Sequence, residues 1–395
     1  MKVAIINNIY PPYDRGGAEQ VVVKTVAGLR AAGHQVVVIT TTPGKAETEV
    51  VAQDLTIYRI HPRNLFFYTD AHKHNAFARF VWHVIDIFNR PAAHAVKDIL
   101  AHEKPGVVHT HNLMGLSFLV PKAIRALQLR HIHTVHDVQL VEPSAMILKL
   151  QEKTWRYTGW PTRLYTRLLR ALIGSPHIVI SPSQFLRDFY TSRGFFKTST
   201  IQVVRNPVMF APLPPIARPV NPVTRFGYIG QIETHKGVSL LVQAFQNLSA
   251  DTQAELHIMG NGTQLEQLKK ETENDARIYW YGRVERKTLP DILQTLDALV
   301  VPSLCYENSP TVIFESFACH VPVIASNIEG IAELIQEGEN GFTFAAGSAT
   351  SLTERLAWST IHRSDLARMG ANTQTFLAGL SLSEYIARLE TVYKA

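Results

Sequence analysis

The chain has 395 residues, of which 46% are hydrophobic and 18% charged, and its formal net charge is +6. High apolar content and modest net charge exclude an intrinsically disordered chain, and the length favours two domains. Two cysteines, Cys305 and Cys319, exclude a disulfide framework and lie in no zinc-binding spacing. No apolar run approaches the roughly 18 residues of a spanning helix. The start turns polar at Asn7, too early for a signal peptide, so we expect a cytoplasmic protein.

Short apolar runs alternate with helix-length amphipathic stretches through residues 1–205. The stretch Ala18–Ala32 is predicted to be a helix that ends at Gly33. The strands predicted in this half are Val3–Ile6, Val36–Thr40, Val107–His111, Ile132–His136 and Ile178–Pro182. Strands that alternate with helices indicate a parallel sheet covered by helices, which is an α/β architecture.

Residues 206–222 interrupt this pattern with six prolines. Proline lacks the backbone donor and fixes φ, so we interpret the segment as a linker between two domains. The alternation resumes in residues 223–375, and the strands predicted there are Phe226–Ile229, Leu256–Met259, Ile278–Tyr281, Leu299–Pro302 and Val321–Ala325. A last amphipathic helix is predicted at Leu382–Tyr393.

Charge is divided unevenly between the two halves. Residues 1–205 carry 25 Lys and Arg against 13 Asp and Glu, whereas residues 206–395 carry 14 against 20. The segment Lys149–Arg170 concentrates the cations and interleaves them with Trp155, Tyr157, Trp160 and Tyr165. This pattern is typical of an anionic membrane surface contact, or of an ordinary surface helix whose aromatic side chains pack on the sheet. Nucleic acid is disfavoured, because no recognised binding motif accompanies the charge.

Two loops that follow predicted strands suit anion binding. Gly16-Gly17 precedes a predicted helix, whose free N–H groups carry partial positive charge. The alternative is a simple turn. The loop Gly230–Gly237 contains Lys236 just before a glycine, which can put an ammonium on a phosphate. The alternative there is a solvated lysine.

The segment Pro302–Glu315 predicts a helix start beside two carboxylates. Ser309 is a good N-cap and Pro310 a good first helical residue. Glu315 would then lie in the second turn, with Glu307 in the preceding loop. A buried glutamate needs hydrogen-bond donors, and two vicinal ribose hydroxyls would supply them. Either glutamate alone is also compatible with a surface position or a helix cap.

Histidines end two predicted strands of the first half. His136 closes Ile132–His136, where it can make a polar contact or carry a proton. His109 and His111 close the neighbouring strand, and we interpret them as hydrogen-bonded structural residues. No Cys/His/Asp cluster has zinc spacing, and no Asp-x-Asp follows a hydrophobic strand. We therefore expect neither a metal nor a cofactor.

Taken together these motifs resemble the retaining glycosyltransferases of family 4, which have the GT-B fold. The resemblance runs over nearly the whole length and rests on the motifs Gly16–Glu19, Val107–Asn112, His133–Asp137, Asn206–Val208, His235–Gly237 and Pro302–Pro322, with Glu307 and Glu315 as the E-x7-E element. It implies two Rossmann-like domains that face each other across a cleft. Residues 1–205 would form the acceptor side and residues 223–375 the nucleotide-sugar side, with residues 376–395 returning to the N-terminal domain.

The resemblance also implies roles for individual residues. Glu315 would bind the ribose diol, Glu307 the hydroxyls of the donor sugar, Lys236 the diphosphate, and His136 the donor sugar, with His136, Lys236 and Glu307 as the catalytic set. The other implied donor-binding residues are Gly16, Gly17, Gln231, Arg283, Val284, Asn308, Ser309, Pro310, Thr311 and Val312.

Four positions depart from the family pattern. Gln231 stands where the family often has Arg, His320 where Gly is usual, and Glu329 in place of the first glycine of a Gly-Gly pair. Glu142 precedes Pro143, where many members have Cys. These departures bear on donor preference rather than on the presence of a site.

The resemblance implies transfer of a sugar from a UDP- or GDP-linked donor to a glycan or lipid-linked acceptor, with retained anomeric configuration, in cell-surface polysaccharide or glycoconjugate biosynthesis. The alternatives are a nucleotide-sugar epimerase, an α-glucan synthase, or a non-catalytic protein that binds sugar nucleotides. The expected location is the cytoplasm, at the inner face of the cell membrane.

Overall fold

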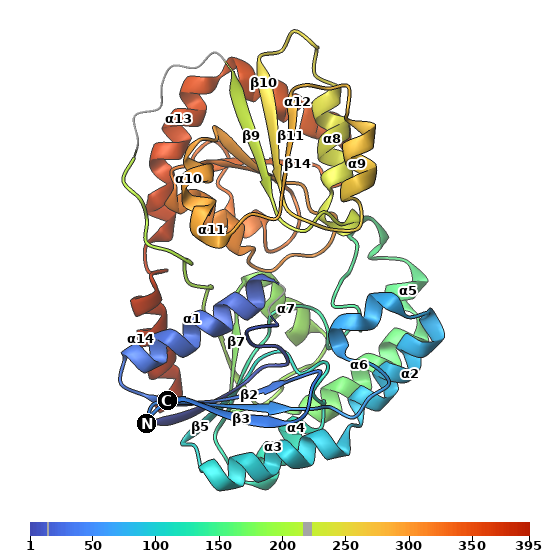
Figure 1. Cartoon of the computed structure of the whole chain (residues 1–395), viewed down its shortest axis with the longest axis vertical. Coiled ribbons are helices and arrows are strands. Elements are labelled where there is room, and N and C mark those ends of the chain that lie inside the picture. Colours follow the sequence, from blue (N-terminus) through green and yellow to red (C-terminus); the bar gives the residue numbers. More distant parts are fainter. Residues whose placement is uncertain (14–15, 216–222) are drawn as a thin grey trace. The chain divides into compact units, whose positions relative to one another are not determined.

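The computed structural model describes residues 1–13, 16–215 and 223–395. Two compact α/β units are present, in agreement with the predicted fold class (Figure 1). The first unit comprises Met1–Met146, Thr154–Pro207 and Leu382–Ala395, and the second comprises Ile147–Lys153 and Val208–Ser381. Within the described residues, no helix combines the length and the apolar character that crossing a membrane requires.

The first unit is built on an eight-stranded sheet with the order β3-β4-β2-β1-β5-β6-β7-β8. All neighbouring strands pair in parallel except β3 and β4, which form an antiparallel edge. The strands are β1 (Lys2–Ile6), β2 (Gln35–Thr41), β3 (Glu47–Ala52), β4 (Leu55–Ile60), β5 (Val107–Thr110), β6 (His131–Thr134), β7 (Ile178–Ser181) and β8 (Thr200–Val203). The central strands are buried on both faces, which explains their unbroken apolar runs.

Helices cover this sheet. They are α1 (Gly17–Ala31), α2 (Ala76–Ile87), α3 (Arg90–Glu103), α4 (Val120–Ala126), α5 (Trp155–Thr158), α6 (Trp160–Ile173), α7 (Gln184–Ser192) and α14 (Leu382–Lys394), with 3₁₀ turns η1 (Tyr68–Lys73) and η2 (Lys149–Gln151), of which η2 lies in the second unit. The last helix packs on α1 so closely that a Cβ at Gly28 would lie 2.5 Å from Ile386. Residues 376–381, placed with this helix at the sequence level, belong to the second unit.

The second unit is built on a six-stranded parallel sheet with the order β11-β10-β9-β12-β13-β14. Its strands are β9 (Thr224–Ile229), β10 (Ala254–Met259), β11 (Ile278–Gly282), β12 (Ala298–Val301), β13 (Val323–Ser326) and β14 (Gly341–Phe344). Its helices are α8 (Val238–Gln246), α9 (Leu265–Glu271), α10 (Leu289–Gln294), α11 (Thr311–Ala318), α12 (Ala349–Ile361) and α13 (Arg363–Asn372), with 3₁₀ turns η3 (Thr234–Lys236), η4 (Arg286–Thr288), η5 (Ala332–Leu334) and η6 (Thr373–Leu377).

Alternate residues of the central strands enter two hydrophobic clusters, one on each face of this sheet. In β12, Val300 joins one cluster, whereas Leu299 and Val301 join the other. Both faces are therefore buried beneath helices, so the sheet exposes its loops at the strand ends.

The chain passes between the units within the predicted linker and again before the last helix, as predicted, and also at both ends of Ile147–Lys153, which was not predicted. Residues 206–215 form no helix or strand, as their prolines predict, and residues 216–222 lie outside the described residues. The short segment Ile147–Lys153, placed in the first half at the sequence level, belongs to the second unit. The helix α14 then returns the chain to the first unit.

Gly237 allows the loops that follow β9 and β12 to approach each other. Its φ is +74°, and a Cβ at this position would lie 1.9 Å from the carbonyl oxygen of Pro302. The residue after Lys236 must therefore be glycine for two independent reasons, backbone conformation and space.

Gly237→Ala should therefore destabilise the second unit strongly. The matched control is Gly338→Ala, since Gly338 has the same φ of +74° but open space around the added Cβ. We expect a loss of about 1 kcal/mol in the free energy of unfolding for the control and at least about 2 kcal/mol more for Gly237→Ala. Chemical denaturation of the full chain measures both, and equal losses would refute the steric argument.

Candidate functional site

The loops after β9 and β12 lie where the strand order of the second sheet reverses. In open α/β sheets the crevice beyond the carboxyl ends of two such strands is the usual ligand site. Here the Leu304 N–H donates to the His235 carbonyl oxygen at 2.9 Å, which ties the two loops together. The loops that carry Lys236 and Glu307 therefore meet at the place where a ligand is expected.

Lys236 and Glu307 are in direct contact. The Lys236 Nζ donates to Glu307 Oε1 at 2.5 Å, and the Ser303 hydroxyl donates to the same oxygen at 3.1 Å. Burial alone would lower the pKa of Lys236, but the Glu307 carboxylate outweighs it and raises that pKa above its usual value. Lys236 is therefore a fixed cation at neutral pH.

The neighbouring thiol is chemically inert. Cys305 is buried, and burial together with the Glu307 charge raises its pKa to about 12. A thiol that stays protonated is a poor nucleophile. Cys305 is therefore not expected to act as a nucleophile in this loop.

Glu315 lies in the second turn of α11, as predicted, with only 3% of its surface exposed. Its ion-pair partner is Arg286, on the turn η4 after β11. Burial raises the pKa of Glu315, and the Arg286 guanidinium offsets this only in part, so the pKa stays above its usual value. The predicted helix start was wrong by one residue, because the helix begins at Thr311 and Pro310 takes the N-cap position.

The other residues of the second unit that were predicted to bind the donor lie in the loops at the same edge of its sheet, or at the start of α11. Gln231 is exposed after β9, and its carbonyl oxygen accepts the Tyr228 hydroxyl at 2.6 Å. Arg283 and Val284 follow β11. The remaining five lie between β12 and the first turn of α11, and they are Asn308, Ser309, Pro310, Thr311 and Val312. The backbone N–H groups at the start of α11 have no acceptor one turn back within the helix, which suits an anion.

The segment Ile147–Lys153 braces the loop before Glu307. Leu148 pairs with Cys305 in an antiparallel bridge, the Lys149 N–H donates to the Leu304 carbonyl at 2.8 Å, and the Tyr306 N–H donates to the Ile147 carbonyl at 2.9 Å. The sequence analysis missed this brace, because a single antiparallel bridge leaves no hydrophobic period to detect.

Two departures from the family pattern have structural partners. Glu329 forms an ion pair with Lys149, and the retained Gly330 has a φ of +85° and would place a Cβ 1.9 Å from the Glu307 carbonyl oxygen. His320 adopts a φ of +57° just after α11, where glycine is favoured. Its Nε2 lies 3.1 Å from the Leu213 carbonyl oxygen and 2.8 Å from Gln374 Nε2, so the side chain has partners that a glycine lacks.

In the first unit, Gly16 and Gly17 begin α1. Gly16 is extended, with a φ of −153°, so its backbone does not require glycine. A Cβ there would lie 3.2 Å from Glu19 Oε2, a tight approach. The nearby Asp137 has its pKa raised to about 6 by burial and in part by the Glu19 charge. The start of α1 and the loop after β6 are therefore neighbours.

His136 lies beyond the end of β6, because β6 ends at Thr134 and not at the predicted His136. Its Nε2 is 2.9 Å from His111 Nδ1, and burial lowers the pKa of His136 to about 4. His136 is therefore neutral at physiological pH and can hydrogen-bond a hydroxyl without carrying a charge. A cavity of about 10 Å³ beside the pair has room for a water molecule and not for a sugar.

His109 is fully buried, and both of its ring nitrogens have partners. Nδ1 lies 2.7 Å from the Tyr393 hydroxyl on α14, and Nε2 lies 2.7 Å from the Thr134 hydroxyl. The interpretation of His109 as a structural residue agrees with these bonds. Across the described ranges, no group of three or more His, Cys, Asp or Glu side chains is placed to hold a metal ion.

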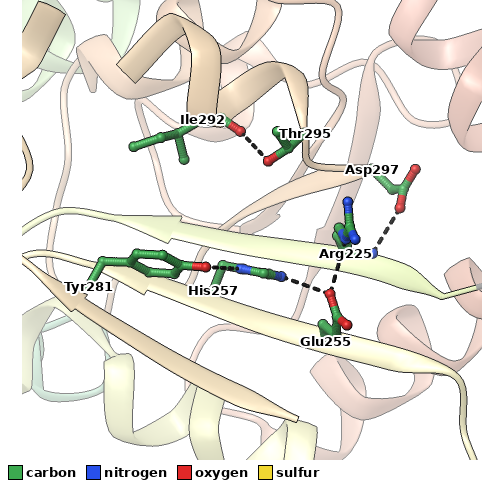
Figure 2. Close-up of polar contacts among 7 residues, drawn as sticks. All are labelled: Arg225, Glu255, His257, Tyr281, Ile292, Thr295 and Asp297. Carbon is green, nitrogen blue, oxygen red and sulfur yellow. Dashed lines mark hydrogen bonds and ion pairs between the residues drawn. The ribbon is translucent and has the colours of Figure 1, made fainter. Parts of the chain in front are cut away.

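A separate hollow of about 470 Å³ opens on the second sheet, where it is lined by Arg225 of β9, His257 of β10, Tyr281 of β11 and residues in and after α10. Figure 2 shows its polar contacts: Tyr281 Oη is 2.8 Å from His257 Nδ1, His257 Nε2 is 3.1 Å from Glu255 Oε2, and Arg225 Nε donates to the same oxygen at 3.0 Å. These side chains bind one another, so we infer that this series of hydrogen bonds supports the sheet.

Arg286 is the site residue that the sequence analysis missed. Its signal was available, because a glutamate in a buried helix turn requires a cation or several donors nearby. The loop after β11 holds several basic residues, and sequence alone could not choose among them.

Removal of Arg286 should cost stability in a pH-dependent way. Arg286→Ala leaves the Glu315 carboxylate buried and unpaired, so the pKa of Glu315 should rise further. Because the guanidinium is half exposed, we expect a loss of about 1 kcal/mol in the free energy of unfolding at pH 8 and a smaller loss at pH 5, where the carboxyl can be protonated. In a Glu315→Gln background the pH dependence should vanish. Denaturation at both pH values tests this, and an equal loss in both backgrounds would contradict it.

Acid should weaken the first unit. Burial lowers the pKa of five histidines on and beside β5 and β6, to about 3 or 4 for three of them and well below the usual value for the other two: His109, His133, His136, His111 and His131. Unfolded, they take up protons near pH 6.5. Stability is therefore lost as pH falls below about 6.5, by about 1.4 kcal/mol per pH unit for each proton.

Two buried carboxyls oppose this trend, because their pKa values are raised, to about 7 for Asp86 and about 6 for Asp137. The folded state keeps these protons, but the five imidazoles outnumber them. Hydrogen exchange at pH 7 and pH 5, corrected for intrinsic rates, should show β5 and β6 losing protection more than β12 and β13. Constant protection of β5 and β6 would refute the prediction.

The chain matches two family models. The model described as Glycosyltransferase Family 4 matches residues 15–209, and the model described as Glycosyl transferases group 1 matches residues 219–376. Among curated relatives, an uncharacterized 42.6 kDa protein in the cps region of Klebsiella pneumoniae is 25% identical over 340 residues, which cover 85% of this chain and 87% of the relative. Glycogen synthase from Mycobacterium tuberculosis is 25% identical over 372 residues, covering 89% and 84%.

Solved structures share the fold over the whole chain. Sucrose-phosphate synthase from Thermosynechococcus elongatus has a TM-score of 0.77 at 18% identity, covering 100% of this chain and 98% of that one. HepE from Anabaena in complex with UDP and glucose has a TM-score of 0.71 at 16% identity, covering 100% of both. The two family matches lie on the two units described above, and the chain belongs to the family 4 glycosyltransferases of the GT-B type.

Proposed function

We propose that the protein is a retaining hexosyltransferase that moves a sugar from a UDP- or GDP-linked donor to a glycan or lipid-linked acceptor. The observation that carries the proposal is the contact of Lys236 with Glu307 at the reversal point of the second sheet. It brings a fixed cation and a carboxylate to one place, beside the start of α11. A nucleoside diphosphate sugar needs both, since its diphosphate is anionic and its sugar presents hydroxyls.

The proposed chemistry follows from these groups. As the anomeric C–O bond breaks, negative charge grows on the departing diphosphate, and Lys236 with the N–H groups at the start of α11 would stabilise it. Glu307 would hold the sugar hydroxyls and Glu315 the ribose diol. The acceptor oxygen would attack from the face of the leaving group, and its proton would pass to the leaving phosphate oxygen. For the neutral His136 we propose a hydrogen bond to the donor sugar.

The comparisons support the substrate classes in part. HepE was solved with UDP and glucose, which supports a nucleotide-sugar donor. The Klebsiella relative is named for the cps region, which supports a role in polysaccharide biosynthesis. We further propose that no metal is needed, because Lys236 supplies the cation, and that the protein works at the inner face of the cell membrane.

An α-glucan synthase is the second candidate, because glycogen synthase is among the relatives. Elongation of a glucan primer from a nucleotide-glucose would favour it. Failure to extend such a primer, together with transfer to a lipid-linked acceptor, would favour the first proposal.

A donor screen tests the proposal directly. Thermal stability of the full chain should rise with one UDP- or GDP-sugar, by the same amount with magnesium and with a chelator. Stabilisation that requires the metal would refute the metal-free part, and no stabilisation by any donor would refute the site.

Substitutions should separate binding from chemistry. Lys236→Ala should lower kcat about a hundredfold or more, because it removes charge stabilisation that grows in the transition state. Glu315→Gln should mainly raise KM, since the ribose does not change during transfer. The matched control Lys287→Ala removes an exposed lysine on the turn η4 and should leave both constants unchanged. Full kcat in Lys236→Ala would overturn the assignment.

A further inference from the structure

Helix α2 exposes large apolar side chains along one face. Phe77, Phe80, Val84 and Phe88 follow each other at helical spacing, and Phe77 and Phe80 are 76% and 65% exposed. The opposite face is buried through Trp82. A helix on a water-exposed surface carries polar residues on its outer face, whereas this one exposes mainly large apolar side chains, with Arg79 as its exposed charged residue.

The helices α5 and α6 continue the same pattern. Trp155 is 65% exposed, Trp160 is 69% exposed and Leu164 is 58% exposed. Arg163 and Arg167 are exposed one turn apart beside Leu164. These tryptophans do not pack on the sheet, so the simple interpretation of this segment as a surface helix with buried aromatic residues is wrong for Trp155 and Trp160.

The two apolar surfaces lie on the same side of the first unit. Figure 1 shows α2, α5 and α6 gathered there. Burial raises the pKa of Tyr165 on α6, and the charge of Asp86 on α2 raises it further. The two helices therefore lie close together. We call this surface the aromatic patch and define it by the residues Phe77, Phe80, Trp155, Trp160 and Leu164.

The segment that carries α5 and α6 is rich in cations, although one of them, Arg156, is paired with Glu142. Residues 153–173 contain five Lys and Arg and no Asp or Glu. The single acid of α2, Asp86, is buried with 1% of its surface exposed. Tryptophan and phenylalanine side chains with arginines between them suit the headgroup region of a bilayer, where the rings enter the apolar boundary and the guanidinium groups meet lipid phosphates.

We propose that the aromatic patch docks the protein on an anionic lipid bilayer. The patch is an exposed apolar surface of a kind that water-soluble monomers rarely keep without a partner. The excess of positive charge, with Arg163 and Arg167 exposed, favours an anionic surface over an ordinary protein surface of mixed charge. The inference deepens the proposed function and rests on it, since a lipid-linked acceptor would be met at that surface.

Vesicle sedimentation of the full chain tests the proposal without any donor or acceptor. The probes are vesicles of phosphatidylcholine alone and of phosphatidylcholine with phosphatidylglycerol. The test variants are Phe77→Ser/Phe80→Ser and Arg163→Gln/Arg167→Gln. The matched controls are Val50→Ser/Val51→Ser, on the exposed strand β3, and Lys287→Gln/Arg368→Gln, on the second unit.

The wild type should bind the anionic vesicles well above the neutral ones, and binding should weaken in high salt. The arginine variant should lose roughly 30-fold in affinity, which corresponds to about 1 kcal/mol per cation. The phenylalanine variant should lose at least tenfold. Both controls should bind like the wild type.

Three results would overturn the proposal: no vesicle binding by the wild type, equal binding to neutral and anionic vesicles, or equal loss in the controls. Sedimentation in the absence of lipid tests whether a second copy of the chain, and not a bilayer, covers the patch. If the wild type is a dimer that does not bind vesicles, and Phe77→Ser/Phe80→Ser makes it monomeric, the patch is the interface with a second copy of the chain. Donor-induced thermal stabilisation, measured on the same variants, should be unchanged. Vesicle binding without any donor effect would thus leave the patch standing while the proposed function fails.

Discussion

The close approach of two loops underlies the whole candidate site. Gly237 lets the turn after β9 lie against Pro302 after β12, and only this proximity allows Lys236 to reach Glu307. The strand order creates the reversal point, and the absence of a side chain at Gly237 allows the two loops to meet there. The charge pair therefore depends on a steric condition at a neighbouring residue that has no chemistry of its own.

Carboxylates and cations are paired throughout this edge of the second unit. Glu307 binds Lys236, Glu315 binds Arg286, and Glu329 binds Lys149. A buried carboxylate is costly without a partner, and Glu307 and Glu315, which are the more buried of the three, each have a cation. If a donor binds one of these residues, as proposed, that residue must exchange its present ion-pair partner for a group of the donor. In the proposed function, such an exchange would favour a ligand that fits, because a poorly fitting one would leave a charge buried.

Sequence patterns predicted the parts of the fold that are buried on both faces. The central strands of each sheet, the helix after Gly16 and the last helix all carry apolar runs or periods that burial imposes. Strands β3, β4, β8 and β14 were missed, because exposed or half-buried residues interrupt any apolar run in them. Likewise the contact of Lys236 with the Glu307 loop followed from topology, whereas Arg286 did not, since loop conformation chooses among several nearby cations. The local sequence pattern predicts helices and strands, whereas the tertiary structure determines which side chains form ion pairs.

The brace formed by Ile147–Lys153 makes the second unit discontinuous in the chain. Recombination between relatives at the proline-rich connection would exchange residues 208–381 as one piece and leave this short segment behind. In the hybrid, Ile147–Lys153 would pack against a Glu307 loop that comes from the other parent. Lys149 would then lie beside the residue that the other parent has in place of Glu329. An exchange of halves between relatives is thereby constrained, because seven residues from the other half must change together with the second unit.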